Sequence, residues 1–412
     1  MIRLFRRLGA RFWIRFALAC LVAFSLEALF DHYVESETTP GLAQSIFNVY
    51  GLYEKIVLAP RNAFPERTSV IEIDPADPGA VSIHDVCRQR AMTATVLRTI
   101  APFLPRVIVI DKYYLNSECD SNAALRDAIR DVSATIPVIV GRRIADESKE
   151  PRYLMDALAL PQQPGGHLAG AVVNIDRDTR KLPLEWAAFD SASAARQGGA
   201  LVWQETLALT ASRAFEAPAA VTDHHPRLGW LIDHQSHPYV SFIDASQFPC
   251  LPVTALTSPG LPSACMGKPI ASLEKLSGTV VLLGEINPDL DEHASPIGPM
   301  SGLYMQANYI EALLDERYYR AVPVFDYIYG LLFLIGLEMA LIVYPGEWLK
   351  LAGALVILFA GLLLLLWVTI MLFRCYVNPA LVGGIAVLIK IVHSFFAPAE
   401  HAAHERARHQ RA

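Results

Sequence analysis

The apolar runs of this chain constrain its fold more than any other feature, because they lie only near its two ends. One run covers residues 12–30, and three more follow at 322–344, 349–373 and 376–396. Each is long enough, or nearly so, to cross a hydrocarbon core about 30 Å thick at a rise of about 1.5 Å per residue. Residues 31–321 have the composition of ordinary globular sequence. The sequence therefore predicts a folded domain that transmembrane helices on both flanks hold at one side of a bilayer.

Positive charges predict which side of the membrane this domain faces. Five arginines lie in segment 1–11 and the start of the first run, no acidic residue precedes Glu27, and the tail 397–412 carries three more arginines. Short flanks rich in Lys and Arg stay in the cytoplasm, so both ends are expected there and residues 31–321 outside. Arg374, in the short outer loop, runs against the rule. A cleaved signal peptide is the alternative for the first run, but no small-x-small motif follows it, which favours an uncleaved anchor.

The cysteines of the outer domain predict disulfide bonds. Cys87, Cys119, Cys250 and Cys265 lie in a compartment where thiols oxidise. Cys87 and Cys119 follow two predicted strands at similar distances, which favours the pairs Cys87–Cys119 and Cys250–Cys265 among the three pairings. Four buried thiols are the alternative. No CxxC pair or Cys/His cluster has zinc spacing, so no metal site is predicted.

Charge and motifs exclude several functional classes. The net charge is −6, and no basic patch lies outside the membrane flanks, so nucleic-acid binding is not expected. The sequence has no G-x-S-x-G elbow, no P-loop and no G-x-G-x-x-G after a strand. We therefore expect neither an enzyme nor a cofactor.

The pattern of the outer domain is that of an α/β fold. Short β-branched runs alternate with helical periodicity, which favours a mainly parallel sheet with helices on both faces. The predicted strands are 69–74, 106–111, 136–141, 171–176, 230–233 and 279–284, and the predicted helices are 88–103, 122–132, 201–213 and 304–314.

Acidic residues end several of these strands. Ligands of open α/β sheets bind outside the carboxyl ends of the strands, where Asp74, Asp111 and Glu285 fall. If the strands of Asp74 and Asp111 are neighbours, both carboxylates face one crevice and suit a cation or a cationic ligand. The alternative is that they cap the loops that follow.

Three other groups of polar residues are weaker candidates. Asp289, Asp291, Glu292 and His293 form an acidic cluster that suits a divalent ion or a pH-sensitive loop, and a solvated loop is the alternative. Four histidines lie close together in the sequence, namely His224, His225, His234 and His237. They suit a metal site or a proton sensor, and a surface loop is the alternative. Glu338 is the one acid deep in the last three runs, where it suits a functional contact or a hydrogen bond to Tyr329 or Thr369.

Segment 276–323 resembles the carboxyl-terminal part of a CHASE2 domain. It has the apolar strand ending in glycine at 280–284, an acidic turn, Ser-Pro at 295–296, Gly302, and the Ala-Asn pair at 307–308. The strands VIEID at 70–74 and VIVID at 107–111 resemble the first two strands of that family. VVNIDRDTRKLPL at 172–184 resembles its Asp-x-Asp-Gly-x-x-Arg segment, with Thr179 in place of glycine. The resemblance covers about residues 40–322, and the flanking runs fit it. Gln306 stands where the family often has His.

The resemblance implies an extracytoplasmic sensory module of a bacterial signalling receptor. On this basis we expect a multi-pass protein of the inner membrane whose periplasmic domain binds an unknown ligand or an envelope partner. The tail after residue 396 has no room for a kinase or cyclase, so the expected output is a separate signalling protein. Receptors of this layout usually signal as dimers, and nothing in the residues requires a dimer. The alternative is an assembly subunit that keeps the fold without sensing, and a crevice filled by side chains would favour it.

Overall fold

The computed structural model describes most of the outer domain and two of the four apolar runs. The described residues are 65–75, 85–114, 119, 121–145, 153–155, 167–175, 179–191, 199–215, 238–257, 264–286, 291–344 and 348–376. Several predictions fall outside them, namely the first apolar run, nearly all of the fourth, the strand 230–233, Asp289 and the four clustered histidines.

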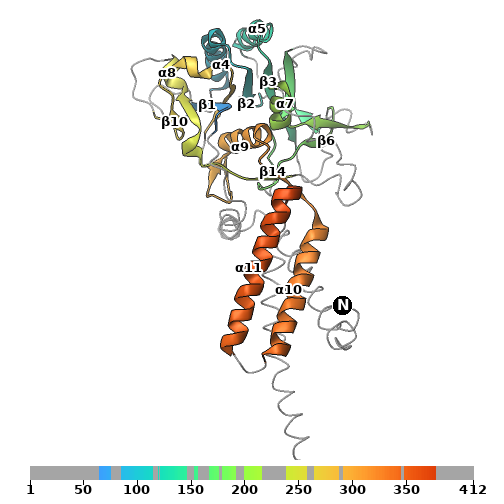
Figure 1. Ribbon diagram of the computed structural model, residues 1–412. Coiled ribbons are helices and arrows are strands. Elements are labelled where there is room, and N and C mark those ends of the chain that lie inside the picture. Colours follow the sequence, from blue (N-terminus) through green and yellow to red (C-terminus); the bar gives the residue numbers. More distant parts are fainter. Residues whose placement is uncertain are drawn as a thin grey trace, which may run out of the picture.

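A ten-stranded mixed sheet forms the centre of the domain (Figure 1). Its strand order is β10-β9-β1-β11-β2-β3-β4-β6-β7, and β5 also pairs with β3. The strands are β1 (Thr68–Ile73), β2 (Val107–Asp111), β3 (Val138–Ala145), β4 (Tyr153–Met155), β5 (Leu168–Val172), β6 (Glu185–Phe189), β7 (Leu201–Glu205), β9 (Pro249–Pro252), β10 (Lys268–Pro269) and β11 (Val280–Glu285).

The middle of the sheet is parallel and the edge beyond β3 is mixed. β11 pairs in parallel with β1 on one side and with β2 on the other. β3 and β4 pair antiparallel, as do β6 and β7. The three central strands are buried on both faces, which is why β2 and β11 begin with four apolar residues in a row. β1 is also fully buried but carries Glu72 among its apolar residues. The predicted α/β class with a mainly parallel sheet is confirmed.

Helices cover both faces of the sheet. α4 (Val86–Ile100), α5 (Ser121–Ser133) and α8 (Val253–Thr257) pack on one face, over a core that contains Ile108 and Leu283. α7 (Leu207–Ala214) and α9 (Gly302–Leu314) pack on the other face, over a core that contains Val109 and Leu282. Neighbouring residues of one strand thus point into the cores on opposite faces of the sheet, because successive side chains of a strand alternate between its two faces. Short 3₁₀ helices are η2 (Ala101–Phe103), η4 (Ala245–Gln247) and η5 (Leu273–Leu276).

The predicted helix 201–213 is wrong in its first part. Leu201–Glu205 forms β7, which pairs antiparallel with β6, and the helix α7 begins only at Leu207. Thr206 caps that helix, because its side chain accepts a hydrogen bond from the backbone N–H of Leu209 at 3.5 Å. Valine and tryptophan in 201–205 suit a strand, and pairing with β6 decides for it.

The disulfide bonds in the structure join the pairs that the sequence analysis favoured. Cys87, in the first turn of α4, bonds to Cys119, two residues before α5 begins. Cys250 in β9 bonds to Cys265, which lies just before β10. The first bond thus ties together the starts of the two helices that cover one face.

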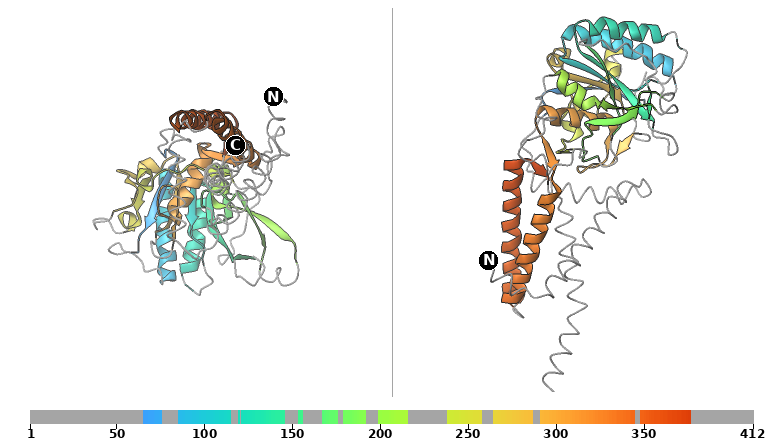
Figure 2. Two further views of the ribbon diagram at one scale, coloured as in Figure 1. Left: turned by 90° about the horizontal axis from the view of Figure 1, so that it is seen from below. Right: turned by 90° about the vertical axis from the view of Figure 1, so that its right-hand side faces the viewer.

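Two long helices leave the domain side by side (Figures 1 and 2). α10 (Pro323–Val343) matches the second apolar run, and α11 (Trp348–Phe373) matches the third. Among the described residues, Leu349–Phe373 is the helical segment long and apolar enough to cross a membrane; α10 contributes the shorter apolar segment Ile328–Leu337. Tyr376, the first residue of the fourth predicted run, lies in a short strand instead.

A three-stranded sheet joins this helix pair to the domain. β14 (Tyr318–Ala321) runs between β8 (Tyr239–Val240) and β15 (Cys375–Tyr376). Because β14 precedes α10 and β15 follows α11, the pair leaves the domain and returns to it. The ring of Tyr376 stacks on that of Tyr239, with centroids 3.9 Å apart. Arg374, which ran against the charge rule, forms an ion pair of 2.7 Å with Glu316 of the domain.

α10 and α11 also contact each other through polar groups. The hydroxyl of Tyr329 donates to the carbonyl of Leu365 at 3.1 Å and forms a short hydrogen bond with the hydroxyl of Thr369. These are the residues that the sequence analysis considered as partners for Glu338. Glu338 lies in α10, and its side chain is outside what the structure describes.

Candidate functional site

A crevice opens where the chain turns to opposite faces after two neighbouring strands. β2 leads into α5 on one face, whereas β11 leads into α9 on the other. Such a switch point leaves a gap at the carboxyl ends of the two strands, and it is where ligands of open α/β sheets bind. The gap here is a pocket of about 490 Å³. We call it the central crevice, and its polar lining includes Gln89, Asp111, Lys112, Arg143, Glu285 and Asp291.

The pleat of the sheet distributes the charges at the end of β2. Successive side chains point to opposite faces, so Asp111 lies on the side of α9 and Lys112 on the side of α4. The Nζ atom of Lys112 forms an ion pair with Oε2 of Glu285 at 2.9 Å, and it also donates to the side-chain oxygen of Gln89 in α4. Lys112 and Glu285 therefore neutralise each other on the α4 side.

Asp111 is placed differently, because it is half-buried and lines the central crevice on the α9 side. Gly284 is its partner on β11, and a methyl group at that position would lie 3.2 Å from Cβ of Asp111 and 2.5 Å from Cδ1 of Leu303. Glycine at 284 thus lets α9 approach this carboxylate. Loss of contact with water and, to a smaller extent, the nearby charge of Asp291 together raise the pKa of Asp111 to about 8.

Asp291 and His293 close the central crevice beside the start of α9. The backbone N–H of Gly302, the first residue of α9, donates to the carbonyl of Asp291 at 2.9 Å. A methyl group at position 302 would lie only 2.4 Å from Oδ2 of Asp291. Nε2 of His293 lies 3.2 Å from Oδ1 of the same carboxylate. Glycine is therefore needed at 302 for the carboxylate to sit on the helix, where the helix dipole favours negative charge.

Two aromatic residues form another part of the wall. Arg143 of β3 donates a hydrogen bond to the hydroxyl of Tyr113 at 2.5 Å, and its guanidinium carbon lies 5.0 Å from the ring centroid. Tyr114 is buried, and Arg90 of α4 lies over its ring at 5.6 Å. Both rings are thus held in place by arginines.

The structure brings together three of the five residues that the sequence analysis selected. Asp111, Glu285 and Asp291 line the central crevice. Asp74 does not, because β11 lies between β1 and β2, so the expectation that the strands of Asp74 and Asp111 are neighbours is wrong. Asp289 lies outside the described residues.

Sequence reasoning missed the basic residues of the crevice. Lys112 and Arg143 come from β2 and β3, and Gln89 comes from α4. Lys112 directly follows a selected aspartate, which was the available signal. Nothing in the sequence signals that Arg143 reaches the same crevice, because that depends on the register of β3 against β2.

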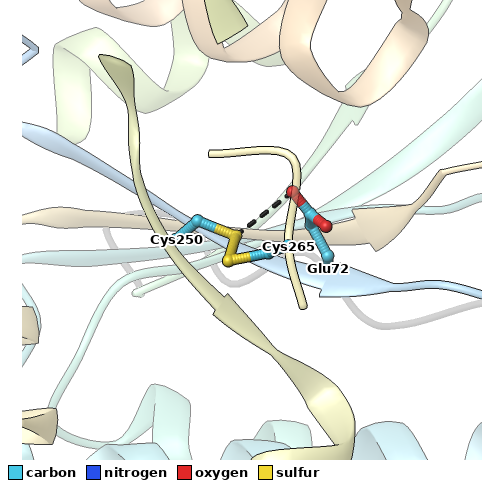
Figure 3. A group of neighbouring side chains, drawn as sticks. All are labelled: Glu72, Cys250 and Cys265. Carbon is cyan, nitrogen blue, oxygen red and sulfur yellow. Dashed lines mark hydrogen bonds between the residues drawn. A yellow bond between two sulfur atoms is a disulfide. The ribbon is translucent and has the colours of Figure 1, made fainter. Parts of the chain in front are cut away.

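A second cluster of polar side chains is buried between the sheet and α9 (Figure 3). Glu72 is 0% exposed, accepts hydrogen bonds from the hydroxyl of Tyr304 and from the backbone N–H of Met266 at 3.0 Å, and has Sγ of Cys250 at 3.1 Å. Burial raises the pKa of Glu72. Its carboxylate and the two sulfur atoms of Cys250 and Cys265 lie within 4.8 Å of one another, a spacing that would suit a metal ion. Because the sulfurs are bonded to each other, they are not thiolate ligands.

Comparison with known families agrees with this architecture. The family model of the CHASE2 domain matches residues 16–362. The chain belongs to the CHASE2 domain family. CHASE2 domains are extracytoplasmic sensory modules. The match extends beyond residues 40–322 at both ends, and it includes most of the first apolar run, all of α10 and the first part of α11. No curated protein and no solved structure matches the chain.

The raised pKa of Asp111 predicts a pH dependence of stability. The unfolded chain releases this proton near pH 4, whereas the native state holds it until about pH 8. The contribution of Asp111 to the free energy of unfolding should therefore fall as the pH rises from about 4 to about 8, by at most about 1.4 kcal/mol per pH unit, and stay constant above that. Asp111→Asn should lack this fall.

Denaturant unfolding of the purified protein between pH 5 and 9 measures this pH dependence of the free energy of unfolding. Asp131→Asn, at an exposed position of α5, is the matched control and should titrate like the wild type. Parallel pH profiles for wild type and Asp111→Asn would contradict the burial of this carboxyl group.

Proposed function

We propose that this CHASE2 protein is a membrane-anchored sensor whose central crevice binds a small extracytoplasmic ligand. Occupancy of the crevice would move α9, and α9 would pass the change through β14 to α10, α11 and a separate signalling protein. One observation carries the proposal. The first residue of α9 lines the crevice, and the last turn of the same helix leads directly into the strand that joins the membrane helices.

α9 is well suited to transmit such a change because it is rigid. All of its residues are buried, so it packs on every side against the domain. The side-chain amide of Gln306 donates to the carbonyl of Val173, a crevice residue, at 2.9 Å. Asn308 accepts from the backbone N–H of Ile243 at 2.7 Å and donates to its carbonyl. A shift at the crevice would therefore be carried along the helix as a whole.

The far end of α9 is fixed to the membrane junction by charged groups. Arg317 is buried, donates to the carbonyl of Ser241 and lies 3.6 Å from Asp315. Burial lowers the pKa of Arg317, and the charges of Asp315 and Glu311 oppose that effect. Ser241 directly follows β8, so this arginine connects the end of α9 to the strand beside β14.

The proposed membrane topology is that of a four-pass inner-membrane protein with its large domain in the periplasm. It is supported by the pairing of β14, which precedes α10, with β15, which follows α11, because a helix pair that starts and ends at the domain suits two successive passes. Exposed apolar side chains on α11, including Ile357 at 74% and Leu364 at 63%, suit contact with lipid or with a partner helix.

Filling the central crevice should abolish ligand binding. Val86 is a half-buried crevice residue in the first turn of α4, and Val86→Phe would occupy part of the space. Small polar metabolites screened against the full-length protein in detergent should raise the melting temperature of the wild type, and Val86→Phe should lose the response.

Ala91→Phe, at an exposed position of the same helix, is the control and should respond like the wild type. Equal responses of Val86→Phe and wild type to every compound would place the ligand elsewhere.

The proposed output partner can be captured directly. Full-length protein, purified in mild detergent from the cells that produce it, should bring down a kinase, cyclase or phosphatase that mass spectrometry identifies. Recovery of envelope proteins only, or of the chain alone, would contradict signalling to a separate protein and favour an assembly subunit.

A further inference from the structure

Among the residues that the structure describes, the carboxylate of Asp111 has no counter-charge on its own side of the sheet. Within the described part of the chain, no side chain or backbone N–H forms a hydrogen bond or ion pair with it, and the charge that acts on it is another carboxylate, Asp291. Asp111 is half-buried in the crevice. A carboxylate that is partly removed from water and has no partner is costly, so it either stays protonated or accepts a positive group from a ligand.

The basic side chains of the central crevice are engaged with other groups. Lys112 is held on the α4 side by Glu285 and Gln89. Arg143 donates to the hydroxyl of Tyr113 and lies over its ring. The α9 side of the crevice therefore carries two carboxylates, Asp111 and Asp291, and the imidazole of His293 next to the second of them. Within the described lining, this side carries no lysine or arginine that is not already engaged elsewhere.

A metal ion fits this place less well than an organic cation. Metal binding needs three or more ligand atoms in one cluster, and among the described residues that spacing occurs at Glu72, Cys250 and Cys265, not in the crevice. An ammonium group needs only one to three acceptors at hydrogen-bond distance. The volume of about 490 Å³ leaves room for the rest of a small organic molecule.

We propose that the ligand of the central crevice is a small organic amine whose primary ammonium group binds the carboxylate of Asp111. This inference rests on the ligand-binding function proposed above and names its chemistry. Asp291 adds attraction from the wall beside α9, which is the wall that leads to the membrane helices. An ammonium group on Asp111 therefore acts directly at the start of α9.

The raised pKa of Asp111 gives this mode of binding its own signature. At pH 7 the carboxyl group of the free protein holds a proton, which an arriving ammonium group must displace. Amine binding should thus release a proton near pH 7 and release none well above pH 8. An uncharged ligand would release no proton at either pH.

Isothermal titration of full-length protein in detergent tests the inference. The probes are small primary amines, beginning with ethanolamine, glycine and putrescine, and their counterparts with hydroxyl in place of the amine, namely ethylene glycol, glycolate and butanediol. At least one amine should bind wild type, and its hydroxyl counterpart should bind at least about 30-fold more weakly. Titration in buffers with different ionisation enthalpies counts the protons released.

The variants separate this inference from the function on which it rests. Asp111→Asn should weaken amine binding at least about 30-fold and abolish proton release, whereas Asp131→Asn should leave both unchanged. The comparison of each amine with its hydroxyl counterpart needs only wild-type protein. It therefore tests the preference for an ammonium group even if Asp111→Asn fails to fold. If both compound types bind equally well and Val86→Phe loses this binding, the proposed amine ligand is wrong, but the central crevice remains a ligand site. Absence of binding by every probe, together with no response in the metabolite screen, would overturn both.

Discussion

The placement of β11 between β1 and β2 is the constraint on which the rest of this structure depends. The last strand of the parallel core pairs on both sides with strands from the start of the domain, so its core closes only when residues more than 160 positions apart meet, as Val280 and Val107 do. β11 then leads to α9 on one face while β2 leads to α5 on the other. This divergence opens the central crevice and sets Asp111 opposite Gly284 at its base.

From that point, one helix connects two places with different chemistry. α9 begins at a crevice that contains carboxylates and ends just before β14, the strand that leads into α10. Because all of its residues are buried, a displacement at Gly302 cannot be absorbed by solvent-facing side chains and must repack the domain or move β14. The stack of Tyr239 on Tyr376 and the ion pair of Glu316 with Arg374 join the same strand region to the end of α11. One buried helix and a short sheet thus connect the central crevice of this sensory domain to the helix pair α10 and α11.

Local patterns predicted the fold class and most elements, because continuous apolar strands and amphipathic helices are written in short stretches of sequence. They also placed Asp111 and Glu285 at strand ends and selected Asp291 as part of an acidic cluster. They failed where pairing between distant segments determines the structure. Residues 201–205 have a helical pattern, but pairing with β6 makes them a strand. Asp74 lies in another part of the sheet because β11 separates its strand from β2. Lys112 and Arg143 were missed because their places in the crevice follow from the pleat and register of β2 and β3.

The most direct test of the connection between crevice and membrane uses a single methyl group. Gly302→Ala places that group against the carboxylate of Asp291 at the start of α9, whereas Gly353→Ala adds one to open space on α11. Hydrogen exchange of both full-length variants should be measured by mass spectrometry in a membrane mimetic. We expect faster exchange of the backbone amides of β8 and β14 in Gly302→Ala, and wild-type exchange there in Gly353→Ala. A change in Gly302→Ala that stays within residues 291–305 would contradict transmission through α9.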